Sequence, residues 1–164
     1  MDFTLKKYTT LLQALKDKGY RFITFEQYVQ DKALADAGKW VILRHDVDAR
    51  AANALATARI EHALGIQASY YFRVVAQSNK PEIIKEIVLL GHEIGYHYED
   101  MAICDGDAGQ AILHFEKLYC ILKSNWLISG SFILSGPSAC MARRAVDLMA
   151  ANCGSITTIT ILRL

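Results

Sequence analysis

The stretch WVILRHDVD, residues 40–48, decides the fold and points to one end of a strand. Its apolar first half is typical of a strand buried in a sheet, and it then passes into Arg44, His45, Asp46 and Asp48. Because side chains alternate along a strand, we expect Asp46 and Asp48 on one face and His45 on the other. Two neighbouring carboxylates favour a hard divalent cation, with one acid as its ligand and the other as a general base.

Spacing alone leaves a second interpretation of Asp48 open. This residue could instead cap a helix that begins near Arg50, and the two interpretations have about equal support.

An alternation of strands and helices surrounds this stretch. Helical periodicity covers residues 5–15 and recurs after Thr24, which predicts an N-terminal helical cap. The following segments are predicted as strand 40–46, helix 50–64, strand 66–75, helix 80–90, strand 92–98 and helix 107–122. This order predicts an α/β fold with a parallel sheet covered by helices, whose active site lies at the carboxyl ends of the strands.

A second polar strand end follows at GHEIGYHYED, residues 91–100, which contains His92, His97, Glu99 and Asp100. Only His97 falls at the carboxyl end, so it is the better metal-ligand candidate. We expect Asp48 and His97 on adjacent parallel strands, with their side chains within reach of one metal ion. His62 and His114, inside predicted helices, are interpreted as structural.

Composition limits the classes of partner. The chain has 164 residues, 52% of them hydrophobic, and a formal charge of +1, which predicts one domain and no nucleic-acid partner. Its first residues carry charges throughout, and no window reaches about 18 uncharged apolar residues, so we expect a cytoplasmic protein without a membrane segment. The four cysteines show no C-x-x-C spacing and are expected to be reduced thiols.

The pair RHDVD and GHEIGYHYED resembles the polysaccharide deacetylase (NodB-homology) family, carbohydrate esterase family four, over roughly residues 38–120. The resemblance implies a distorted (β/α) barrel, present here in part. It also implies that Asp46 acts as the base and that Asp48 and His97 bind a divalent metal, zinc or a similar ion. The family has a further histidine where this chain has Met101, whose thioether is a poor ligand.

A third ligand would then have to come from another residue, and His92, Glu99 and Asp100 are the alternatives. The implied function is a metal-dependent, deacetylase-like hydrolase that acts on C–N (amide) bonds of acetylated sugars or similar small acetylated substrates. The alternative from another class is a non-catalytic carbohydrate-binding or assembly protein with a degenerate metal site. The metal content of the purified protein distinguishes these two functions.

The C-terminal part differs in composition from the rest. The first 116 residues contain sixteen acids, whereas residues 117–164 contain only Asp147 together with five bases. We therefore divide the chain into a deacetylase-like region, 1–122, and an atypical tail, 123–164. A frameshift would explain the tail, since a shifted reading restores an ordinary charge balance and a late histidine; a natural short chain with an unusual end is the alternative. The final run GSITTITILRL predicts a strand with no covering helix, an open edge that favours self-association.

Overall fold

The computed structural model of the chain describes residues 4–30, 38–126 and 157–163. Within these ranges the elements are, in order, α1 (Leu5–Asp17), β1 (Arg21–Ile23), α2 (Phe25–Gln30), β2 (Trp40–Val47), α4 (Ala51–Ala63), β3 (Ser69–Phe72), α5 (Pro81–Leu89), β4 (Glu93–Tyr96), α6 (Asp100–Ile103), α7 (Ala108–Trp126) and β5 (Thr157–Arg163). The prediction of an α/β fold with a parallel sheet and covering helices is confirmed. Strand β1 has no counterpart in the prediction, because three residues are too few to show alternation.

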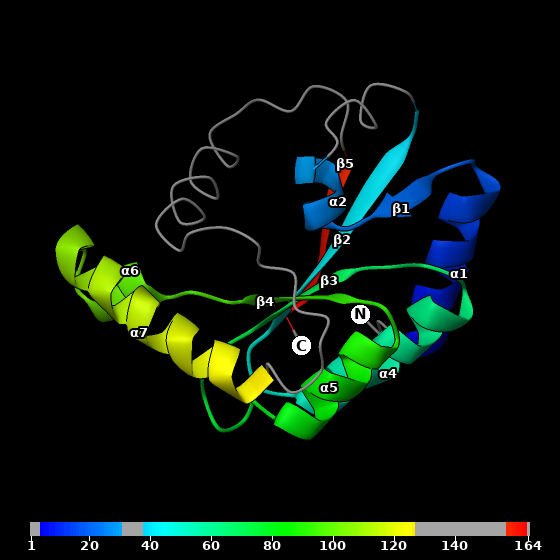
Figure 1. The fold of residues 1–164 in the computed structure, drawn as a ribbon. Coiled ribbons are helices and arrows are strands. Elements are labelled where there is room, and N and C mark those ends of the chain that lie inside the picture. Colours follow the sequence, from blue (N-terminus) through cyan, green and yellow to red (C-terminus); the bar gives the residue numbers. More distant parts are fainter. Residues whose placement is uncertain (1–3, 31–37, 127–156, 164) are drawn as a thin grey trace.

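The sheet is parallel and runs in the order β1-β2-β3-β4, with β5 also paired to β2 (Figure 1). Strand β3 therefore lies between β2 and β4, and the expectation that Asp48 and His97 follow adjacent strands is wrong. The strand predicted in the final run is confirmed: β5 lies parallel to β2, with Val41 opposite Thr157.

Alternate residues of β2 pack into two separate hydrophobic clusters. Val41 and Leu43 belong to the main core, which also contains Tyr8 and Leu12 of α1 and further residues of α4, α5 and α7. Trp40 and Ile42 belong to a smaller cluster that α2 covers through Tyr28. The sheet is thus covered on one face by α1, α4, α5 and α7, and on the other, near the start of β2, by α2 (Figure 1).

Two local features explain where helices begin. The side chain of Thr4 accepts a hydrogen bond from the backbone N–H of Lys7 and so caps α1. Helix α5 begins at Pro81, a residue without a backbone N–H and therefore suited to the first turn. In the part of the chain described here, no helix combines the length and apolar character needed to cross a membrane.

Candidate active site at the strand ends

Three polar side chains meet where β2 and β4 end. The imidazole of His97 lies between two carboxylates: its Nε2 is 3.8 Å from Asp46 Oδ2 and its Nδ1 is 3.7 Å from Asp48 Oδ1. The side chains of His97, Asp46 and Asp48 are 18%, 20% and 29% exposed, so each lies partly at the surface. His45 is fully buried on the opposite face, as the alternation predicts.

The alternative role for Asp48 is not observed. Helix α4 has Arg50 at its N-cap position, and no side chain makes a capping hydrogen bond there. The interpretation of Asp48 as a helix cap is therefore wrong, and its carboxylate remains directed to the strand-end cluster.

The register of the sheet explains how His97 reaches across β3. Asp46 lies opposite Tyr71, and Tyr71 lies opposite Gly95, so these three positions form one row on the same face. The ring of Tyr71 lies so close to Gly95 that a Cβ there would be 2.5 Å from Cε1 of the ring. His97 follows Gly95 by two positions on that face, and its backbone N–H still donates to the carbonyl of Phe72.

Arg44 contacts two members of this row, Asp46 and Tyr71. Its Nε donates a hydrogen bond of 2.8 Å to Asp46 Oδ1, and its guanidinium carbon lies 4.6 Å from the centroid of the Tyr71 ring. Burial raises the pKa of the Tyr71 phenol, and the nearby Glu93 carboxylate raises it further, so this phenol stays neutral. One carboxylate oxygen of Asp46 is therefore held by Arg44 while the other faces His97.

The residues considered as a third ligand lie elsewhere. Glu99 Oε2 is paired with Nη2 of Arg73 at 2.5 Å. His92 is buried in the core, where its Nε2 donates to the carbonyl of Ala58 and its Nδ1 accepts from the backbone N–H of Ala68. Burial lowers the pKa of His92, which keeps the ring neutral.

Asp100 and Met101 are also separate from this cluster. The buried Asp100 accepts hydrogen bonds at Oδ1 from Nδ1 of His114 (2.5 Å) and from the hydroxyl of Tyr96 (3.3 Å). The side chain of Met101 is exposed. Within residues 4–30, 38–126 and 157–163, no group of three or more His, Cys, Asp or Glu side chains is arranged to hold a metal ion.

Two of the predicted ligands nevertheless fit one divalent ion. Zinc binds nitrogen and carboxylate oxygen at about 2.1 Å, so two such ligand atoms at a tetrahedral angle lie about 3.4 Å apart. Asp48 Oδ1 and His97 Nδ1 are 3.7 Å apart, close to that span. The Nδ1 atom of His97 is buried and has no hydrogen-bond partner, which leaves its lone pair available to a cation in the neutral tautomer protonated at Nε2.

A second polar cluster, in the core, has no counterpart in the prediction. The buried carboxylate of Glu61 on α4 accepts hydrogen bonds from the hydroxyls of Tyr8 and Tyr70 and from Nε2 of His45. Burial alone would raise the pKa of Glu61, but these hydrogen bonds and the charge of His45 outweigh it and lower the pKa. The sequence holds one signal, since Glu61 falls at helical spacing from the buried Ala54, Thr57 and Ala58.

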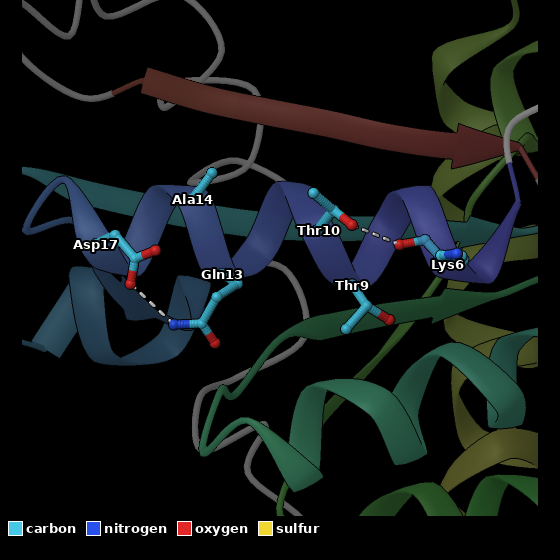
Figure 2. A pocket seen from close by; sticks show the side chains of 6 residues that line it. All are labelled: Lys6, Thr9, Thr10, Gln13, Ala14 and Asp17. Atoms are coloured by element: carbon cyan, nitrogen blue, oxygen red, sulfur yellow. Dashed lines mark hydrogen bonds between the residues drawn. The ribbon is translucent and has the colours of Figure 1, made fainter.

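An open hollow on α1 is distinct from the strand ends. Figure 2 shows the side chains that line it, those of Lys6, Thr9, Thr10, Gln13, Ala14 and Asp17. The hydroxyls of Thr9 and Thr10 donate to backbone carbonyls one turn earlier, and Gln13 donates to Asp17. All three hydrogen bonds lie within α1.

Comparison of the chain with protein-family models, curated proteins and solved structures gave no match.

Proposed function

We propose that this chain is a metal-dependent, deacetylase-like hydrolase that acts on the amide bond of acetylated sugars or similar small substrates, and that its sheet is part of a (β/α) barrel of the polysaccharide deacetylase type. The observation that carries the proposal is the position of His97 between Asp46 and Asp48 at the carboxyl ends of parallel strands. Active sites of α/β folds lie at this edge.

The roles of the residues follow from their contacts. Asp48 and His97 would hold a divalent metal such as zinc, which would supply Lewis acidity toward the amide carbonyl and an activated water. Asp46 would accept the proton of the attacking water at Oδ2, because Arg44 already occupies Oδ1. The Arg44 hydrogen bond also fixes the orientation of this base.

Two parts of such a site are not supplied by the described residues: a third ligand and an acid for the leaving amine. The late histidine of the shifted reading falls within residues 127–156, outside the described residues. We therefore expect weak metal binding and impaired activity in this chain. If the frameshift interpretation holds, coding DNA through residues 117–164 will contain the alternative frame, and the restored chain will bind metal more tightly.

A specific observation favours the alternative of a non-catalytic carbohydrate-binding or assembly protein. Met101 is exposed where the related family has a ligand, and Glu99 is paired with Arg73. A degenerate site that binds no metal would explain both features.

Metal stoichiometry decides between the two proposals. The purified full chain would be loaded with zinc or cobalt, and bound metal would be measured by mass spectrometry alongside acetate release from N-acetylglucosamine oligomers. Asp48→Asn and His97→Gln should each abolish stoichiometric metal, whereas Asp17→Asn, a matched change at an exposed position of α1, should not. Absence of bound metal in the unaltered chain, or unchanged metal in Asp48→Asn, would favour the non-catalytic alternative.

A further inference from the structure

Arg44 has more donors than its known contacts use. The guanidinium is held at two points, by Asp46 along its Nε edge and by the Tyr71 ring against one face. Among the residues whose side chains the structure describes, none accepts a hydrogen bond from its Nη groups, although the Arg44 side chain is only 18% exposed. A guanidinium that is fixed in place and still has free N–H groups is preorganised to bind a ligand.

The position of this group relates it to the proposed reaction. Arg44 and Asp46 project to the same face of β2, and Asp46 lies within 3.8 Å of His97. A molecule that contacts the Asp46 carboxylate therefore lies near the guanidinium that donates to the same carboxylate. The planar fork of arginine matches the two oxygens of a carboxylate better than it matches a neutral hydroxyl.

The charges around the cluster favour a negative ligand once a cation is present. Among the described side chains, two carboxylates, those of Asp46 and Asp48, and one guanidinium, that of Arg44, meet there. A divalent cation would leave this group with one net positive charge, and an anionic group on the substrate would balance it.

We propose that Arg44 is a specificity-determining residue that binds an anionic group, a carboxylate by preference, on the substrate of the strand-end site. The substrate class is then an acetylated sugar acid or another acetylated acid. This inference rests on the proposed function for the reaction, but the anion contact itself does not require the metal.

The test compares matched probes on the full chain: N-acetylglucosamine, which is neutral, N-acetylmuramic acid, which adds a carboxylate, and N-acetylglucosamine 6-phosphate. Binding is followed by calorimetry with zinc and again with a chelator. Charge-assisted hydrogen bonds from the Arg44 guanidinium should make the carboxylated probe bind at least about tenfold more tightly than the neutral one. Tighter binding of the phosphorylated probe would instead assign the contact to phosphate and overturn the carboxylate preference.

Three variants and one control variant separate the contact of Arg44 from other effects. Arg44→Gln should remove the preference, and Arg44→Lys, which keeps the charge but not the fork, should retain part of it. Asp46→Asn should strengthen binding of the carboxylated probe by removing a competing negative charge. Arg59→Gln is the matched control, since Arg59 pairs with Glu86 at an exposed site between α4 and α5 and should leave the preference unchanged.

The outcomes are distinguishable from failure of the proposed function. If the preference depends on Arg44 but no metal binds to the unaltered chain, the anion site stands and the hydrolase proposal falls. If metal binds through Asp48 while the neutral and the carboxylated probe bind equally tightly, the inference about Arg44 is overturned. It is also overturned if Arg44→Gln and Arg59→Gln have the same effect on probe binding. Arg44→Lys carries the test if Arg44→Gln does not fold.

Discussion

Replacement of Gly95 by alanine should destabilise the protein by a predictable amount. The added Cβ would lie 2.5 Å from Cε1 and 2.6 Å from Cδ1 of Tyr71, whereas carbon atoms pack at about 3.5–4.0 Å, so the ring must move by about 1 Å. The ring cannot move freely, because Arg44 lies over it and Phe25 packs edge-on at 6.1 Å between centroids. Overpacking of this kind costs about 1–3 kcal/mol, and loss of the arginine contact adds about 0.5–1 kcal/mol.

We therefore expect Gly95→Ala to lower the free energy of unfolding by about 2–4 kcal/mol in urea denaturation, with an unchanged m-value. Gly38→Ala is the matched control, since among the described residues its Cβ would meet only Trp40, at an ordinary 3.7 Å. It should change stability by less than about 1 kcal/mol.

A double-mutant cycle tests the assigned cause. In a Tyr71→Ala background the obstruction is gone, and Gly95→Ala should cost less than about 1 kcal/mol. An equal cost in both backgrounds would refute the argument, as would a Gly95→Ala protein as stable as the unaltered one.

Three further outcomes are expected. Glu61→Ala should lower the free energy of unfolding by about 3–5 kcal/mol, because it removes the carboxylate that accepts hydrogen bonds from three buried donors. Glu82→Ala in the exposed first turn of α5 should cost under about 1 kcal/mol in the same denaturation assay. The pKa of His92 is lowered in the folded chain, so as the pH falls the unfolded chain binds a proton first. Stability should therefore fall as the pH drops below about 6.5, and His92→Gln should flatten this part of a pH–stability curve. An equally steep curve in the variant would contradict the assignment. The exposed apolar side chains of Ile112 and Leu113 on α7 should promote self-association. Light scattering should therefore show an average mass that rises with protein concentration and that is lower in Leu113→Lys. A monomer at all concentrations would show that the apolar groups and the sheet edge do not drive association.

Periodicity and local chemistry predict most elements of this fold but not the order of its strands. The strand at 40–46 and the helices at 50–64 and 80–90 appear within a few residues of the predicted bounds, because hydrophobic spacing is a local property. Placement of β3 between β2 and β4 depends on which faces pack together, and spacing along one strand carries no information about its neighbours.

The candidate site shows the same division. The opposite directions of His45 and Asp46 follow from strand geometry, and the convergence of Asp48 with His97 follows from their positions at carboxyl ends. The pairing of Glu99 with Arg73 could not be predicted, because it joins the end of β3 to the start of α6 across a distance in sequence that no periodicity connects.

The opposed directions of His45 and Asp46 have a consequence for how the chain reaches its native pairing. A shift of β2 by one position would exchange the two faces, which would bury Asp46 near Glu61 and expose His45. Two carboxylates without cationic partners would then share a site shielded from water, an arrangement that costs several kcal/mol. The sequence RHDVD thus excludes the nearest incorrect alignment of the sheet while the chain folds, whatever molecule the finished site binds.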